Sequence, residues 1–200
     1  MVIKKAEFIE SLASAADMPE DAGKVQIAVV GKSNVGKSSL INCLCNQNQL
    51  ARVSAEPGKT RLVNIFRIND DFHLVDLPGY GYARVSRAMQ EDWGQMMDSY
   101  LSGSEHLCHI LHLVDIRHDP GQHDLQMQAW IQHNQLPCTV IATKCDKLSR
   151  AQQQKSILAI CRALGVQPWD VLPFSSVTRA GRDELLERLG NILGIAEDQP

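Results

Sequence analysis

The chain of 200 residues alternates short apolar runs with segments in which apolar residues recur every three or four positions. Short apolar runs bounded by turn residues are typical of buried strands, and the longer spacing is typical of amphipathic helices. The runs predict six strands, at residues 25–30, 62–68, 72–76, 107–114, 139–142 and 171–174. The periodic segments predict helices at residues 37–46, 87–101, 122–134, 151–164 and 182–193.

The order of these elements predicts the fold class. Strands and helices alternate, which favours an α/β fold of three layers, with a six-stranded, mostly parallel sheet between helices on both faces. Only Asn69, Asp70 and Asp71 separate the second predicted strand from the third, a distance that suits a hairpin loop. One edge strand is therefore expected to run antiparallel.

Three segments divide the chain. Residues 1–23 are expected to form an N-terminal extension with a short amphipathic helix, on which Phe8, Ile9 and Leu12 share one side. Residues 24–195 are expected to form one domain, and residues 196–200 a frayed tail.

The apolar runs also bear on where the protein acts. None approaches the roughly 18 residues that span a membrane, and Glu7 and Glu10 interrupt the apolar positions that a signal peptide would need. We therefore expect a cytoplasmic protein. The six cysteines include no C-x-x-C pair, which fits free thiols in a reducing compartment. His109 and His112 would face opposite sides of a strand, which argues against a metal site there.

Charge changes this picture little. Charged residues make up 22% of the chain and the net charge is −3, which does not mark a nucleic-acid-binding protein. A near-neutral total can still contain a local basic face, and solvated charge is the alternative. The candidates for such a face are Arg61, Arg67, Arg84, Arg87, Lys147 and Arg150.

A glycine-rich motif lies between the first predicted strand and the first predicted helix. Residues 31–38 read G-K-S-N-V-G-K-S, the pattern of a phosphate-binding loop. Successive backbone N–H groups of such a loop surround an anion, and the helix that follows offers its positive end. Lys37 is expected to reach the outer phosphates, and the Ser38 hydroxyl to bind Mg2+. The expected cradle comprises Gly31, Lys32, Ser33, Asn34, Val35, Gly36, Lys37, Ser38 and Ser39.

Two further segments suit the phosphate end of a nucleotide. Asp76 ends a strand and could hold Mg2+ through water, while the Gly79 N–H could contact a third phosphate. Thr60, in a loop after Pro57, could bind Mg2+ only when that phosphate is present. The phosphate-side residues are Gly58, Lys59, Thr60, Arg61, Asp76, Leu77, Pro78 and Gly79. We assign the metal to Ser38, Thr60 and Asp76, and the chemistry to Lys37, Thr60 and Gly79.

Residues after the two last predicted strands indicate which base is bound. Thr143, Lys144, Cys145 and Asp146 form a [N/T]-K-x-D motif. The Asp146 carboxylate can accept two hydrogen bonds from the N1–H and 2-amino groups of guanine, whereas adenine presents an acceptor at N1. A site that leaves such a polar group unpaired discriminates by about 10⁴ to 10⁵. Lys144 would lie along the base plane. The loop of Ser175, Ser176 and Val177 could offer backbone N–H groups to guanine O6.

The order of the motifs is similar to that of translation-factor-like GTPases across nearly the whole chain, and three segments resemble the EngB family of bacterial GTPases. These segments are D-L-P-G-Y-G-Y-A-R-V-S-R at residues 76–87, L-V-D-I-R-H at 113–118 and T-K-C-D-K-L-S at 143–149. The resemblance covers about residues 24–193 and implies a P-loop GTPase fold, GTP and GDP binding with Mg2+, and slow hydrolysis. It also implies a monomer that works with the large ribosomal subunit or its precursor, including its rRNA, and a link to cell division and septation.

The expected slow rate has a reason in the residues. Related enzymes place a glutamine directly after D-x-x-G, where this chain has Tyr80, and a tyrosine ring does not orient water as an amide does. In potassium-dependent GTPases an asparagine at the place of Asn34 helps to bind K+; an Asn that caps the loop is the alternative. The helix at residues 87–101 either packs in the core or meets a partner, with Arg84 and Arg87 near rRNA phosphate. The residues that would either pack in the core or contact the partner are Trp93, Met96, Met97 and Tyr100.

Two other functions compete with a GTP-dependent switch. The first is a metabolic P-loop kinase, against which the base motif argues. The second is a non-hydrolysing scaffold at the division site, against which Lys37, Ser38, Thr60 and Asp76 argue.

Overall fold

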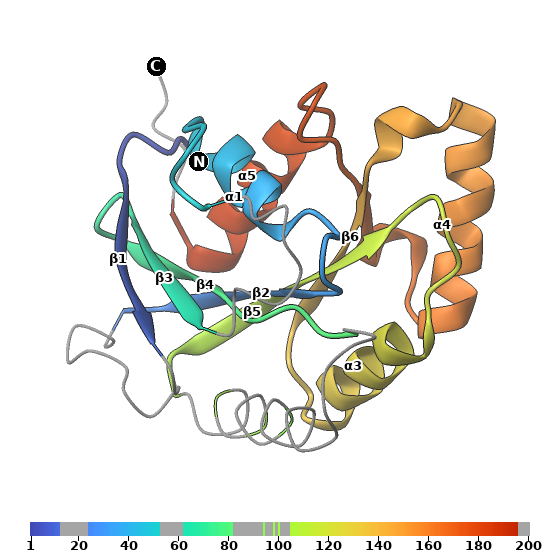
Figure 1. Cartoon of the computed structure of the whole chain (residues 1–200), viewed down its shortest axis with the longest axis horizontal. Helices are drawn as coiled ribbons and strands as arrows, with labels where there is room; N and C mark the ends of the chain where they lie inside the picture. The colour runs from blue at the N-terminus through green and yellow to red at the C-terminus, as the bar shows by residue number, and fades with distance from the viewer. Residues whose placement is uncertain are drawn as a thin grey trace.

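A computed structural model gives the structure of the protein and describes residues 1–12, 24–52, 62–81, 94, 98, 100 and 105–195. In these residues seven strands form one sheet (Figure 1). Their order across the sheet is β1 (Ala6–Leu12), β3 (Val63–Ile68), β4 (Phe72–Asp76), β2 (Gln26–Gly31), β5 (Leu107–Asp115), β6 (Cys138–Thr143) and β7 (Val171–Pro173). The three-layer α/β fold and all six predicted strands are confirmed, and β1 is the additional strand.

A single strand of this sheet is reversed. β3 runs antiparallel to both of its neighbours, β1 and β4, and the other neighbouring pairs are parallel. The hairpin between β3 and β4 is confirmed, with Asn69 and Asp70 in left-handed conformation at its turn. The expectation that the antiparallel strand lies at the edge is wrong, because β1 covers the outer side of β3.

The prediction of a short helix in the N-terminal segment is also wrong where the structure describes that segment. Residues 6–12 are strand β1 and belong to the sheet of the domain. A β-bulge lies between Phe8 and Glu10. Because of this extra residue, Ala6 is buried in the core on one face of the sheet and Leu12 in the core on the other. A bulge breaks the two-residue alternation by which a strand is recognised. Residues 13–23 and 196–200 lie outside the described residues.

Helices cover both faces of the sheet. α1 (Lys37–Cys45) and α5 (Arg182–Leu193) lie together on one face. α3 (Gln122–His133) and α4 (Arg150–Leu164) pack on the other (Figure 1). These four agree with the predicted helices to within one residue at each end. Most of the predicted helix at residues 87–101 lies outside the described residues, although Gly94, Asp98 and Tyr100 are helical.

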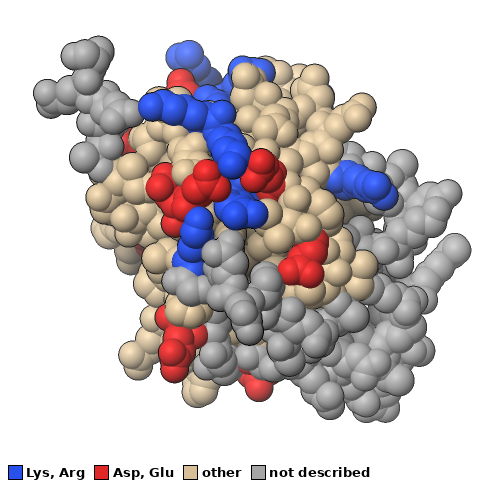
Figure 2. Space-filling model, turned by 90° about the vertical axis from the view of Figure 1, so that its left-hand side faces the viewer, with Lys and Arg blue, Asp and Glu red and all other residues tan. Residues whose placement is uncertain are grey.

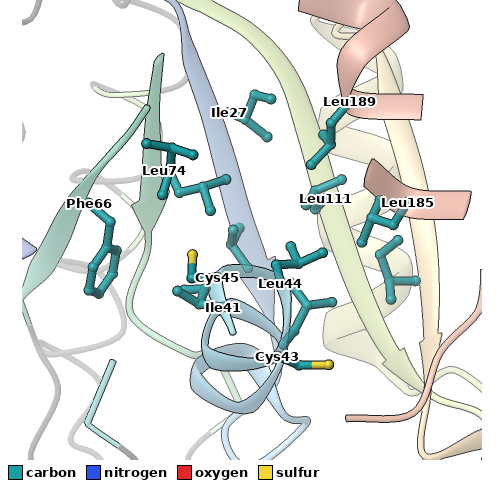
Figure 3. Close-up of a cluster of buried hydrophobic side chains, with 14 of the residues drawn as sticks. Ile27, Ile41, Cys43, Leu44, Cys45, Phe66, Leu74, Leu111, Leu185 and Leu189 are labelled. Carbon is teal, nitrogen blue, oxygen red and sulfur yellow. The ribbon is translucent and has the colours of Figure 1, made fainter. Parts of the chain in front are cut away.

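The core between α1, α5 and the sheet fixes the position of the glycine-rich loop. Ile41 and Leu44 of α1 belong to one buried cluster with Leu111 of β5 and Leu185 of α5, and Leu44 lies on the side of Leu111 (Figure 3). Burying a leucine or isoleucine side chain contributes about 1.5–3 kcal/mol. α1 is therefore held firmly, and its first turn has a defined place above the sheet.

Other expectations about the whole molecule can be compared with this fold. All six cysteines lie in described parts of the chain and are free thiols. No helix within the described ranges is long and apolar enough to cross a bilayer. His109 and His112 of β5 face opposite sides of the sheet, as expected, and bond to Thr139 and Gln128 respectively.

Candidate functional site

Loops from four parallel strands meet at one edge of the sheet. β2, β4, β6 and β7 run in the same direction, so their carboxyl ends lie at the same edge. The glycine-rich loop follows β2, residues 77–80 follow β4, residues 144–146 follow β6 and residues 174–177 follow β7. This edge of a doubly wound sheet is where ligands bind in such folds.

The glycine-rich loop is closed tightly on itself. The Val35 N–H donates to the Lys32 carbonyl oxygen at 3.1 Å. A Cβ atom at Gly31 would lie 2.8 Å from Val35 Cγ1 and 2.9 Å from the Leu113 oxygen, so no side chain fits there. Gly36 has φ of 116°, a conformation that side chains disfavour. The loop therefore depends on both glycines for its shape.

The loop ends at the N-terminus of α1. Gly36 is the N-cap residue and offers no side chain to cap the helix. The first N–H groups of a helix have no partner within it, and the helix dipole makes this end positive. Lys37, Ser38 and Ser39 form the first turn, next to the loop. Such an end is suited to a phosphate group.

Asp76 and Lys37 lie in the floor of this site. Lys37 Nζ is 3.8 Å from Asp76 Oδ1. Burial raises the pKa of the Asp76 carboxyl, while Lys37 and a hydrogen bond from Asn64 oppose this shift. Among the residues that the structure describes, Asp76 Oδ1 has no hydrogen-bond partner. A buried carboxylate oxygen without a hydrogen-bond partner suits a cation. The oxygen donors that the sequence offers here, the Asp76 carboxylate and the hydroxyl of Ser38 in the first turn of α1, are of the kind that Mg2+ prefers.

Residues 79 and 80 lie against the glycine-rich loop. The Ser33 N–H donates to the Tyr80 carbonyl oxygen at 3.0 Å, and the Tyr80 N–H donates to the Gly31 carbonyl oxygen at 3.3 Å. A Cβ atom at Gly79 would lie 2.9 Å from Ser33 Oγ and 3.0 Å from the Ser33 nitrogen. Only glycine therefore allows residue 79 so close to the loop. Leu77, on the same segment, is buried and bonds to the end of β2.

Thr143 and Lys144 connect the end of β6 to the glycine-rich loop. Thr143 Oγ1 lies 2.9 Å from the carbonyl oxygen of Val35 and donates to it. Lys144 has a positive φ of 62°, which turns the chain at this point. Its ammonium group donates to the Asn34 carbonyl oxygen at 3.0 Å and to Asp115 Oδ2 at 2.8 Å. The two loops are thus tied together by side-chain bonds.

Asp115 is a residue of this site to which the sequence analysis gave no role. Arg117 holds it from the other side, with Nε donating to Oδ1 at 2.9 Å and Nη2 to Oδ2 at 2.7 Å. Burial disfavours the charge of Asp115, but the bonds from Arg117 and Lys144 outweigh burial and keep its pKa below the usual range. Asp115 and Arg117 both stand in the D-I-R-H segment. An acidic and a basic residue two positions apart were the signal in the sequence that could have indicated this ion pair.

Asp146 is held by the loop after β7. The Ser175 hydroxyl, itself buried, donates to Asp146 Oδ1 at 2.7 Å. The Ser175 bond, followed by one from Lys147, lowers the pKa of Asp146. The Cys145 N–H donates to the Phe174 carbonyl oxygen at 3.1 Å, which joins the two loops a second time. A charged carboxylate therefore has a fixed place near the glycine-rich loop.

The loop after β7 was expected to offer its backbone N–H groups to guanine O6, and one of these groups has a partner within the loop. The Val177 N–H donates to Ser175 Oγ at 3.2 Å, and the Thr178 N–H to the same atom at 3.1 Å. The Val177 N–H is thus already engaged. Ser176 and Val177 have exposed side chains.

Several predicted residues lie outside the described part of the chain. They are Gly58, Lys59, Thr60, Arg61, Arg84, Arg87, Trp93, Met96 and Met97. Tyr100, in contrast, is buried and its hydroxyl donates to Gln26 Oε1 at 2.8 Å, so it packs in the core.

The described candidates for a basic face do not form one patch. Arg67 lies within 4.0 Å of Glu7 and 3.9 Å of Asp70. Lys147 pairs with Asp146, beside the opposite part of the sheet. Figure 2 shows the side of the molecule with β1, on which basic and acidic side chains are interspersed.

Comparisons with known proteins agree with this geometry. The family model of the 50S ribosome-binding GTPases matches residues 26–144. A probable GTP-binding protein EngB of Clostridium beijerinckii is 50% identical over 190 residues, 94% of this chain and 96% of that protein.

Solved structures show the same fold. A crystal structure of a probable GTP-binding protein engB has a TM-score of 0.73 and 20% identity, covering 86% of this chain and 100% of that chain. The structure of Era in complex with MgGDPNP and nucleotides 1506–1542 of 16S ribosomal RNA has a TM-score of 0.63 and 26% identity. It covers 88% of this chain and 58% of the Era chain.

Proposed function

The chain belongs to the EngB family of GTP-binding proteins, and on this basis we propose that it is a nucleotide-dependent switch in assembly of the large ribosomal subunit. Its fold is that of the P-loop GTPases, a class that hydrolyses GTP. In the proposed cycle it binds GTP with Mg2+, hydrolyses it slowly and releases its partner as GDP forms.

One observation carries this proposal: the ionised Asp146 carboxylate is fixed by Ser175 at the sheet edge that also holds the glycine-rich loop. A carboxylate in this place can accept two hydrogen bonds from guanine. Adenine would set its N1 lone pair against the acid, so ATP would be rejected. Lys144, held between Asn34 and Asp115, would lie along the base.

The phosphate end uses the residues around α1. The loop N–H groups and Lys37 would bind the phosphates, and the Gly79 N–H would contact the third one. Ser38 and Asp76 would hold Mg2+, together with Thr60 from outside the described residues. When bound, the metal neutralises phosphate charge. The chain's contribution is then to hold the triphosphate in line for attack by water.

Slow turnover is supported by the surroundings of Tyr80. Its side chain is buried and its hydroxyl donates to Asp124 at 2.8 Å, so the ring is directed into the interior. A residue in this position does not orient an attacking water. A supplied positive charge raises the rate of such enzymes by about 10³ to 10⁵. We propose that a partner or K+ at Asn34 provides it.

The proposed partner is the large ribosomal subunit or its precursor, including rRNA. The matching family of 50S ribosome-binding GTPases supports the large subunit, and the likeness to Era, which was solved with nucleotides of 16S ribosomal RNA, supports contact with rRNA alone. We further propose that the protein acts in the cytoplasm as a monomer. The link with cell division and septation would follow from this role.

Three measurements test the function. Labelled GTP is competed with unlabelled GTP, GDP and ATP: we expect GTP and GDP to displace it and ATP to fail, whereas displacement by ATP would favour a kinase. Large-subunit particles are then sedimented with the protein under GDP and under a non-hydrolysable GTP analogue. Co-sedimentation that depends on the analogue supports the switch, and equal binding contradicts it. Single-turnover hydrolysis separates an enzyme from a scaffold.

A further inference from the structure

A buried polar network lies behind the phosphate end of the site, on the side of α3. The Tyr80 hydroxyl donates to Asp124 Oδ1 at 2.8 Å and lies 2.8 Å from His112 Nε2. On the other side of the imidazole, Nδ1 lies 2.9 Å from the side-chain oxygen Oε1 of Gln128. All four residues are buried. Polar groups in such a place are costly unless each finds a partner, so their positions are closely defined.

The direction of these bonds follows from the chemistry of the groups. Burial and the nearby Asp124 raise the pKa of the Tyr80 phenol, which therefore keeps its proton. Burial lowers the pKa of His112, which is neutral at pH 7. Because Nδ1 faces the side-chain oxygen of Gln128, the single ring proton of neutral His112 lies on Nδ1, and Nε2 is an acceptor that faces the phenol. The Tyr80 hydroxyl thus lies between two acceptors, Asp124 on α3 and His112 on β5.

The main chain of Tyr80 bonds to the glycine-rich loop, whereas its side chain bonds to α3 and β5. Its N–H and carbonyl groups bond to Gly31 and Ser33 of the glycine-rich loop. Asp124 in turn accepts the Gly121 N–H at 2.9 Å and thereby caps the first turn of α3. One residue therefore links the loop that cradles phosphate to the start of α3, and Gly79 precedes it directly.

We propose that Tyr80 is a positioning residue for recognition of the third phosphate, with Asp124 and His112 as its anchors. This inference rests on the proposed function, since it concerns the Gly79 N–H that would contact that phosphate. A peptide held in advance loses less conformational freedom when the ligand arrives. GDP does not make this contact, so the anchors favour the triphosphate selectively.

The test compares two variants, each of which loses one buried tyrosine hydroxyl. Tyr80→Phe removes the hydroxyl that bonds to Asp124. Tyr100→Phe removes a buried hydroxyl that bonds to Gln26, and it serves as the matched control. Dissociation constants for GDP and for a non-hydrolysable GTP analogue are measured with Mg2+ for the full chain, together with the thermal unfolding midpoint.

We expect Tyr80→Phe to weaken binding of the analogue about threefold to tenfold relative to GDP, the range of one hydrogen bond. Tyr100→Phe should leave this ratio unchanged even if it lowers the unfolding midpoint as much. Equal weakening of both nucleotides by Tyr80→Phe would overturn the inference, because the hydroxyl would then be merely structural. A ratio shifted toward the analogue would also overturn it, since the anchors would then hold Gly79 away from the phosphate.

Asp124→Ala is a second variant that removes the same bond. It should also weaken binding of the GTP analogue relative to GDP. In the double variant with Tyr80→Phe the two shifts in the ratio should not add, because each change removes the same bond between Tyr80 and Asp124. Loss of the bond from Gly121 to Asp124 should lower the unfolding midpoint of Asp124→Ala without changing the ratio. If Tyr80→Phe does not fold, Asp124→Ala alone decides by the same criteria. Failure of the unaltered protein to bind guanine nucleotides would reject the proposed function itself, which is a different outcome from an unchanged ratio.

Discussion

The Ser175 hydroxyl and the Asp146 carboxylate are joined by a hydrogen bond of 2.7 Å between loops 29 positions apart in the chain. Ser175 is fully buried, whereas Asp146 is half-buried, so the donor side of this bond is fixed in the interior and the carboxylate faces the site. The same Oγ accepts the N–H groups of Val177 and Thr178. A single hydroxyl therefore sets both the direction of the acid and the shape of the loop around it.

Replacing Asp146 by Asn should exchange the base that the protein prefers. An amide keeps an oxygen for Ser175, so the fold should persist, but it sets an N–H₂ group where the guanine 2-amino group would lie. We expect the affinity for GTP to fall by up to about 10⁴-fold. Affinity for xanthosine triphosphate should rise, because xanthine has a carbonyl at that position. Competition binding with both nucleotides checks this, and undiminished GTP affinity would refute the assignment of Asp146.

Replacing Ser175 by Ala should weaken all guanine nucleotides alike. The change removes the donor to Asp146 and leaves two N–H groups without their acceptor, at a cost of about 1–3 kcal/mol. We expect the dissociation constants of GDP and GTP to rise together, about fivefold to 100-fold. The neighbouring exposed hydroxyl gives a matched control in Ser176→Ala, for which we expect no change. Equal effects of the two variants would show that the Ser175–Asp146 bond does not matter for the base.

Potassium should accelerate hydrolysis if Asn34 binds it. Asn34 stands exposed in the glycine-rich loop, and its carbonyl oxygen accepts a bond from Lys144. We expect faster single-turnover hydrolysis in KCl than in NaCl at equal ionic strength, and loss of the difference in Asn34→Ala. Indistinguishable rates in the two salts would leave Asn34 as a residue that caps the loop.

His109 should make the fold sensitive to mild acid. Burial lowers its pKa from 6.5 to about 4, and Nε2 lies 2.9 Å from Thr139 Oγ1. The unfolded chain therefore takes up a proton at a higher pH than the folded protein. The stabilising contribution is complete above pH 6.5 and is lost as the pH falls toward 4, by up to about 3 kcal/mol.

The variant His109→Gln isolates this effect, because glutamine can still bond to Thr139 but does not titrate. Free energies of unfolding from urea titrations at pH 7, 5.5 and 4.5 should fall less in the variant than in the unaltered protein. Carboxyl groups titrate in both proteins and cancel in the difference. Parallel pH dependences would contradict the assignment.

The parts of the fold that follow from local pattern could be predicted from the sequence. The helices α1, α3, α4 and α5 each carry apolar residues three or four positions apart, and the glycine-rich loop has a fixed spacing. The meeting of four loops at one edge also follows, since parallel strands end on the same side.

The features that were missed depend on contacts between distant residues. β1 was hidden because its bulge moves Ala6 and Leu12 to opposite faces of the sheet. The sequence did not indicate that Asp115 pairs with Lys144 or that Tyr80 pairs with Asp124, because these residues come together only in the folded chain. A pattern of residue types shows which groups are present, but not which of them will bond.

The position of β1 has a consequence for the protein during its own translation. The Lys4 N–H bonds to Asn69 at the far end of β3, 65 positions later in the chain. At about 5–20 residues per second, a ribosome needs roughly 3 to 13 s to synthesise that interval. Strand β1 must therefore wait for β3, and the outer border of the sheet is completed only after the hairpin of β3 and β4 has emerged.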